Sequence, residues 1–197
     1  MLSRKGVDSE SGGMASPILP CGCLCSIPIP STLPEVRYAD IKFRKHTLQQ
    51  ICNELKPRYS HGLAHLDPDL RPEALASRPK DWRPAFGQSG AAATHLSHKG
   101  IDADDLFIFF GWFRRTKVRT NGKLTFDPAD VHGRHIVWGW LEVGRVWKVV
   151  VPPPDDLRFL DDHPHVKFSE AQGPRNTPAD HTHGLDQDRG ARRRHAP

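Results

Sequence analysis

Two short segments of the chain carry residue types that can move protons or bind a metal ion. In the first segment, His65, Asp67 and Asp69 fall close together on a loop stiffened by prolines. An imidazole and two carboxylates at this spacing suit a divalent cation or general acid–base catalysis. Composition alone favours a structural interpretation, because Asp67 followed by Pro68 is also an ordinary helix start, with an N-cap residue and a proline in the first turn.

The second segment runs from Asp161 to His165 and contains two histidines. Pro164 makes this segment extended, and side chains two residues apart in an extended chain point the same way. His163 and His165 are therefore candidate metal ligands, with a solvated loop as the alternative. The cofactor that these patterns suggest is a divalent metal ion of unspecified kind.

The N-terminal loop has the composition of an anion-binding loop. Its glycines allow backbone conformations that other residues avoid, and N–H groups exposed in such a loop can hold a phosphate. Arg4, Lys5 and Ser11 add side-chain donors. The loop is not a P-loop, because no Gly-Lys-Ser/Thr follows a strand at the required interval. An ordinary surface loop is the alternative.

The elements that must position these residues centre on residues 104–151, the densest apolar and aromatic part of the chain. The apolar run 106–110 predicts a strand buried on both faces. Residues 136–143 alternate in polarity and size, which predicts a half-buried strand. Trp138 and Trp140 share one face of that strand, where they either pack in the core or form a platform on which a base can stack.

Two further segments predict short helices. Residues 47–55 have helical apolar spacing and are stopped by Pro57. Residues 88–96 are rich in alanine, so this helix can pack close to a sheet, and its N-terminus at Gln88 could face an anion. Together with the strands, these helices predict an α+β fold with a mixed, curved sheet or partial barrel and two or three short helices.

Length and charge set limits on the function. The chain has 197 residues, a net charge of +5 and a pI of about 9.2, which permits a nucleotide or nucleic acid as partner without requiring one. No apolar run is long enough to span a membrane and no signal peptide is evident, so we expect a cytoplasmic protein without a membrane partner. Residues 1–170 form the predicted domain, and residues 171–197 are a basic, histidine-rich tail expected to be disordered.

A set of short motifs in fixed order resembles the bacterial and phage family called nucleotide modification associated domain, third type. The motifs lie at residues 2–13, 16–18, 26–30, 38–41, 65–70, 82–88, 105–114 and 163–165. The resemblance covers roughly residues 1–176 and implies that the domain is incomplete at its C-terminal end.

This resemblance implies a setting in DNA base modification, with a nucleotide or DNA as partner and other DNA-modification proteins as further partners. It also implies which loop residues belong to the site, because they fall within the shared motifs. These residues are Arg4, Lys5, Asp8, His65, Asp67 and Asp69.

The strands at 105–113 and 135–149 resemble, more faintly, the barrel of the PUA-like readers. Such domains hold a flipped base in a pocket with aromatic walls. The resemblance implies that Trp112, Trp138 and Trp140 are walls and that Arg114 contacts phosphate.

Two classes of function fit these residues. The first is an enzyme that acts on a nucleotide or modified base through Asp8, His65, Asp67 and Asp69, with Arg4 and Lys5 holding phosphate. The second is a non-catalytic reader or accessory module that binds modified DNA by aromatic stacking and basic contacts. We favour the enzyme, because carboxylates in a pure DNA-binding surface would repel the phosphates.

Overall fold

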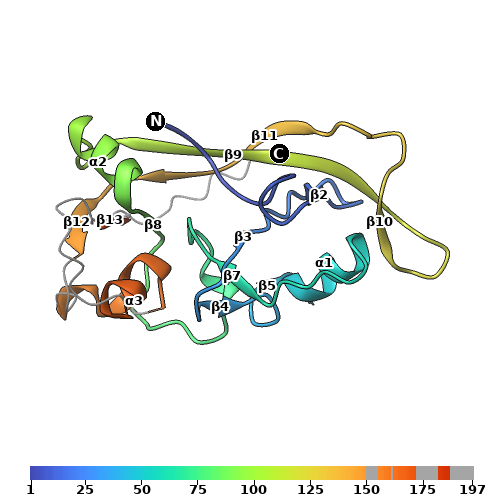
Figure 1. Ribbon diagram of the computed structural model, residues 1–197, viewed down its shortest axis with the longest axis horizontal. Helices are drawn as coiled ribbons and strands as arrows, with labels where there is room; N and C mark the ends of the chain where they lie inside the picture. The colour runs from blue at the N-terminus through green and yellow to red at the C-terminus, as the bar shows by residue number, and fades with distance from the viewer. Residues whose placement is uncertain (150–154, 161, 172–181, 187–197) are drawn as a thin grey trace.

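The structure, a computed structural model, describes residues 1–149, 155–160, 162–171 and 182–186. Its longest strand is β9 (Leu106–Val118), which lies along one side of the molecule (Figure 1). Strands β1 (Leu2–Arg4) and β2 (Ser16–Ile18) pair with β9 in parallel, while β10 (Leu124–Phe126) and β11 (Arg134–Glu142) pair with it antiparallel. All four neighbours therefore take their position from β9.

The prediction that the start of this strand is buried on both faces is wrong. Phe107, Phe109 and Phe113 are buried, whereas the apolar residues between them are only half-buried and Leu106 is 42% exposed. The sheet carries its packed core on one face, where Phe86 lies against Phe107 and Phe109. A run of large apolar residues is thus compatible with a half-buried strand, because exposed apolar side chains are common on protein surfaces.

Strand β11 is half-buried, as the alternating pattern predicts, but it contains a bulge. Its register against β9 shifts between Val137 and Gly139. Val137 is 56% exposed and Leu141 is fully buried, although an unbroken strand would place both on the same face. The bulge at Trp138 therefore changes which side chains of β11 face the core.

The remaining elements form two groups beside the long β9–β11 pair (Figure 1). One group contains a three-stranded sheet in the order β12-β13-β8, two helices and a 3₁₀ turn. Its members are β8 (Ala85–Gln88), α2 (Gly90–His98), β12 (Arg145–Val149), the 3₁₀ turn Asp155–Leu160, α3 (Pro164–Ala171) and β13 (Thr182–Asp186).

The other group contains a three-stranded sheet in the order β3-β7-β4, a short hairpin, one helix and a 3₁₀ turn. Its members are β3 (Ile29–Pro30), β4 (Val36–Arg37), β5 (Lys42–Phe43), β6 (His46–Thr47), α1 (Leu48–Leu55), β7 (Leu63–His65) and the turn Pro72–Ala74.

The predicted α+β class is confirmed, and so are both predicted helices. Helix α1 begins after Thr47, whose side chain forms a capping box with Gln50. Helix α2 begins two residues later than predicted, because Gln88 ends strand β8 and Ser89 is the N-cap. Among the residues that the structure describes, the strands form four separate sheets and no closed barrel.

The predicted disordered tail, residues 171–197, lies largely outside the described residues, although Thr182–Asp186 within it form strand β13. No helix in the described ranges is long and apolar enough to cross a membrane.

Gly133, just before β11, lies where the backbone approaches β9 closely. Its φ is +65°, and a Cβ atom there would lie 2.4 Å from the Phe113 carbonyl oxygen. Gly122 also has positive φ (+78°) but open space around it. We expect Gly122→Ala to lower the free energy of unfolding by about 1–2 kcal/mol through backbone strain alone. Gly133→Ala should lower it by roughly a further 1–3 kcal/mol, because the backbone must also shift.

Urea denaturation of the two variants measures this difference. Equal losses at the two positions would contradict the close approach of Gly133 to β9.

Candidate functional site

The centre of the candidate site is the fully buried carboxylate of Asp67, which follows strand β7. The Lys5 ammonium lies 2.7 Å from its Oδ2, and the Gly87 N–H donates to its Oδ1 at 2.7 Å. Lys5 follows β1 and Gly87 lies in β8, so three segments far apart in the sequence meet at one anion. A buried carboxylate is tolerated only when it is paired and hydrogen-bonded, and these contacts provide that.

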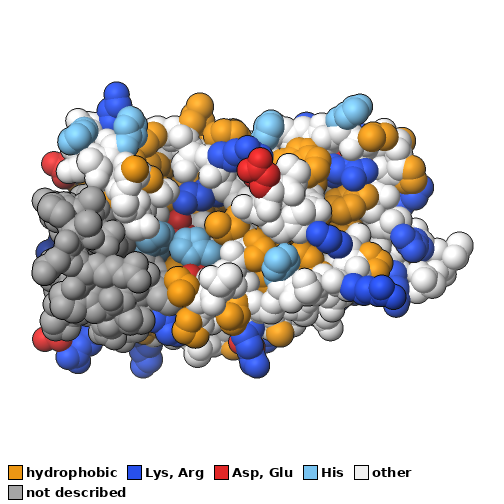
Figure 2. Space-filling model, in the orientation of Figure 1, with side chains coloured by type: hydrophobic (Ala, Val, Ile, Leu, Met, Phe, Trp, Pro, Cys, Tyr) orange, Lys and Arg blue, Asp and Glu red, His pale blue; other side chains and the backbone are white. Residues whose placement is uncertain are grey.

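Three histidines surround the same carboxylate. His163 Nε2 lies 3.5 Å from Asp67 Oδ1, and His165 Nε2 lies 3.8 Å from Oδ2. The ring of His65 meets the ring of His165 edge-on, with 5.0 Å between centroids. The two segments that the sequence singled out separately are therefore brought together by the fold. Figure 2 shows histidine side chains gathered near the middle of one face, with acidic side chains beside them.

Glu35 is a member of this site that the sequence did not reveal. Its side chain is only 3% exposed, and both of its carboxylate oxygens lie 3.1 Å from His65 Nδ1. The register of β4 against β7 pairs Val36 with Ala64, which places the preceding Glu35 beside His65. No sequence signal marks this glutamate, because its role depends on which strand pairs with which.

The charges at the centre follow from burial and from the neighbours. Burial by itself raises the pKa of Asp67, but the Lys5 ammonium, His163 and His165 outweigh it and hold that pKa well below its usual range. Burial lowers the pKa of His165, although Asp67 acts in the opposite direction. Near neutral pH the site therefore contains an ionised Asp67 and a mainly neutral His165.

Asp69 is buried beside this centre but is held by a different cation. The Arg78 guanidinium lies 2.7 Å from its carboxylate. Burial raises the pKa of Asp69, an effect that Arg78 only partly opposes. Its backbone also bridges to Ala85, the first residue of β8. The structure thus places Asp69 next to Asp67 without joining the two carboxylates in one cluster.

The interpretation of Asp67 as a helix N-cap is wrong. The chain after Asp67 is not helical, and the next helical turn spans Pro72–Ala74, with Arg71 as its N-cap. The Asp67 side chain accepts its hydrogen bonds from Lys5 and Gly87, both distant in the sequence. The long-range pairing of the carboxylate therefore takes precedence over the local capping pattern.

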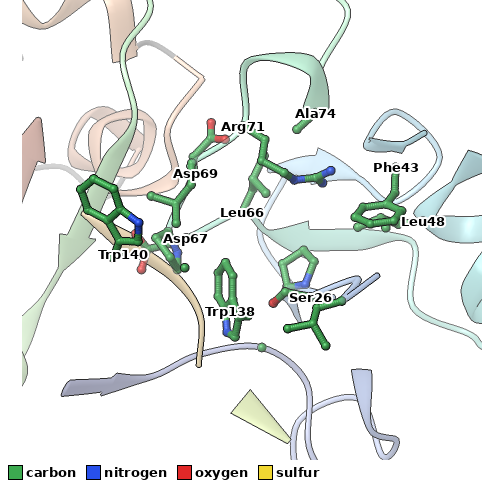
Figure 3. Close-up of a pocket in the computed structure, with 16 residues that line it drawn as sticks. Ser26, Phe43, Leu48, Leu66, Asp67, Asp69, Arg71, Ala74, Trp138 and Trp140 are labelled. Carbon is green, nitrogen blue, oxygen red and sulfur yellow. The ribbon is translucent and has the colours of Figure 1, made fainter. Parts of the chain in front are cut away.

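A cavity of about 290 Å³ opens beside Asp67, close to the lower end of the range for ligand pockets. It lies where the core around α1 meets the core under β9, since both contribute to its lining. Figure 3 shows Asp67 between the indoles of Trp138 and Trp140, with Leu66 and Arg71 across the cavity. The cavity therefore combines apolar walls with charged groups at its edge.

The two indoles contribute differently to this cavity. Trp138 stacks on Phe109, with 5.9 Å between ring centroids, and its buried Nε1 finds no hydrogen-bond partner among the described residues. Trp140 is 55% exposed. Trp138 thus belongs partly to the core, whereas Trp140 offers an exposed aromatic surface.

The predicted residues of the N-terminal loop divide between the centre and the loop itself. Lys5 joins the centre, but Arg4 pairs with Asp8 at 3.0 Å. The Asp8 carboxylate accepts hydrogen bonds from the N–H groups of Glu10 and Ser11, which closes the turn. In this structure Arg4, Asp8 and Ser11 hold the loop and do not line the cavity.

Trp112 and Arg114 lie further along β9 and also do not line the cavity. Trp112 Nε1 donates to the His132 carbonyl at 2.7 Å. Arg114 Nε donates to the Asp130 carbonyl at 2.7 Å, and its guanidinium lies over the ring of Phe126. Gln88, at the end of β8, likewise falls outside the lining.

The fold and the site define an α+β domain with a small cavity that ends at a buried, charge-compensated carboxylate. The chain belongs to the family described as nucleotide modification associated domain 3, whose model matches residues 1–193. The resemblance carried by the short motifs is thereby confirmed, and the chain is associated with nucleotide modification. No curated protein and no solved structure matches the chain.

The buried Lys5–Asp67 pair can be tested by a double-mutant cycle. Removing one partner leaves an uncompensated buried charge, so Lys5→Met or Asp67→Asn should each lower the free energy of unfolding by about 3–5 kcal/mol. The double variant should lose much less than the sum, because neither charge remains.

Guanidinium denaturation provides the measurement. Asp40→Asn is the matched control, because it removes a similar pair with Arg37 on the exposed surface and should leave the midpoint nearly unchanged. Additive losses in the double variant would show that the two charges do not interact.

Proposed function

We propose that this protein is an enzyme that modifies a nucleobase, and that the cavity beside Asp67 receives the base. The observation that carries the proposal is the position of a buried carboxylate, paired with Lys5, at the edge of a cavity with aromatic walls. The family supplies the substrate class, since its members are associated with nucleotide modification.

The walls suit a flat, aromatic ligand. A base stacked on an indole gains about 1–3 kcal/mol, largely independent of base identity. Trp140 is exposed enough to offer such a face, and Leu66 supports an apolar boundary across the cavity. The cavity is large enough for a single base, which would enter it as a free nucleotide or flipped out of a duplex.

The charged groups at the edge suit the rest of a nucleotide. Arg71 lines the cavity, lies over the ring of Phe43 and donates to the Lys42 carbonyl at 3.2 Å, and its nearest carboxylate, that of exposed Glu73, is 4.0 Å away. The carboxylates of Asp67 and Asp69 already have cations of their own. Arg71 is therefore the cation of the lining best placed to attract a phosphate.

An enzyme explains the site better than a reader does. A reader needs aromatic walls and phosphate contacts, but it has no use for a buried carboxylate surrounded by a lysine and three histidines. Such groups hold protons or a metal ion and are found where bonds are made or broken. The Arg114 that a reader would use on phosphate is engaged with Asp130 and Phe126.

The base-binding part of the proposal is tested with tryptophan variants. We expect Trp140→Ala to weaken binding of deoxynucleoside monophosphates or short single-stranded DNA by roughly 5- to 150-fold, because one stacking contact is lost. Trp112→Ala is the control, since Trp112 lies on the neighbouring strand but outside the cavity. Calorimetric titration measures both, and equal effects of the two substitutions would contradict the assignment.

The catalytic part is tested separately by mass spectrometry of nucleosides recovered from incubated DNA and nucleotides. The wild-type chain should change the mass of a base, and the Lys5→Met/Asp67→Asn double variant should not, while it still binds the substrate. Retained turnover in the double variant would show that the reaction does not require the Asp67 carboxylate.

A further inference from the structure

We propose that His65, Asp67 and His165 form a binding site for a divalent transition-metal ion. One potential ligand atom from each residue lies within 4.8 Å of the other two. His165 Nε2 is 3.8 Å from Asp67 Oδ2. Ligand atoms around a tetrahedral zinc ion are about 3.3 Å apart, so the 3.8 Å pair needs to close by about 0.5 Å and no pair by more than about 1.5 Å around an ion.

His65 is already oriented as a metal ligand. Its Nδ1 is held by both oxygens of buried Glu35, at 3.1 Å, which leaves Nε2 as its remaining ring nitrogen. A carboxylate on the far nitrogen of a metal-binding histidine fixes the tautomer and the ring orientation. Burying the Glu35 carboxylate costs free energy unless it is paired, and His65 is the partner that the structure gives it.

His165 is held in place from the other side. Its ring lies so close to Gly87 that a Cβ atom there would come within 2.4–2.7 Å of the His165 side-chain carbons. The same Gly87 donates its N–H to Asp67. Strand β8 therefore positions two of the three ligands relative to each other.

The ligand set indicates the class of metal. Two imidazoles and one carboxylate suit Zn²⁺, Fe²⁺, Co²⁺ or Mn²⁺, whereas Mg²⁺ and Ca²⁺ prefer oxygen ligands throughout. Three protein ligands leave at least one coordination position for water or a substrate atom. Asp67 also lines the cavity, so an ion bound there would lie beside the cavity.

Lys5 and His163 occupy the remaining contacts of Asp67. The Lys5 ammonium, 2.7 Å from Oδ2, supplies the positive charge that an ion would otherwise supply. It therefore competes with the ion for the carboxylate. His163 approaches the other oxygen, Oδ1, from a buried position and makes no hydrogen bond through Nε2 within the described structure. It stays outside the set of three mutually close ligands.

The site is tested with Co²⁺ alone, added to the full chain without nucleotide, so that the result does not depend on the proposed function. Co²⁺ reports its own geometry through visible absorption, and equilibrium dialysis counts the bound ions. We expect one equivalent with the absorption of a site containing nitrogen and oxygen ligands. His65→Gln and His165→Gln should each weaken binding more than tenfold, and Glu35→Gln should weaken it about 10- to 100-fold.

The control is His98→Gln, at the exposed end of α2, which should bind Co²⁺ like the wild type. In Lys5→Met, loss of the competing ammonium should tighten Co²⁺ binding, and the bound ion should restore part of the free energy of unfolding that this substitution removes. Circular dichroism establishes that each variant is folded. No Co²⁺ binding by the wild type, or binding unchanged in both His65→Gln and His165→Gln, would overturn the proposal and indicate adventitious binding to other histidines.

Discussion

The buried charge of Asp67 is the constraint on which the rest of this structure depends. Removing a carboxylate from water costs several kcal/mol even in a relaxed protein, so the anion must be compensated where it lies. Lys5, the Gly87 N–H and two imidazoles provide the compensation, and they come from the end of β1, from β8 and from the start of α3. The three groups of strands thus share one electrostatic centre in addition to their apolar cores.

The spacing of apolar residues along the chain was sufficient to predict helix α1 and the half-buried strand β11. Helix α1 follows from its apolar spacing and its stop at Pro57, and the half-buried character of β11 follows from alternation. The residue types at positions 65, 67 and 165 also identify them as candidate site residues on chemical grounds alone. Residue chemistry can be read directly from the sequence, because an imidazole or a carboxylate keeps its capabilities wherever the fold places it.

The partners of these groups could not be predicted, because they depend on pairing over long distances. The nearest cation to Asp67 comes from a residue 62 positions earlier in the chain, and Glu35 meets His65 only through the register of two short strands. The helix-cap interpretation of Asp67 was wrong for the same reason. The bulge at Trp138 was likewise hidden, because the sequence around it continues to alternate in size while the backbone changes its phase.

The order of the site residues along the chain has a consequence for synthesis. Strands β1 and β7 leave the ribosome early, but the histidines that complete the surroundings of Asp67 lie beyond residue 160. During translation the carboxylate must therefore remain hydrated, or pair only with Lys5 and the Gly87 N–H, until α3 has emerged. The nascent chain can assemble its long hairpin first, whereas the charged centre around Asp67 is among the last parts to form.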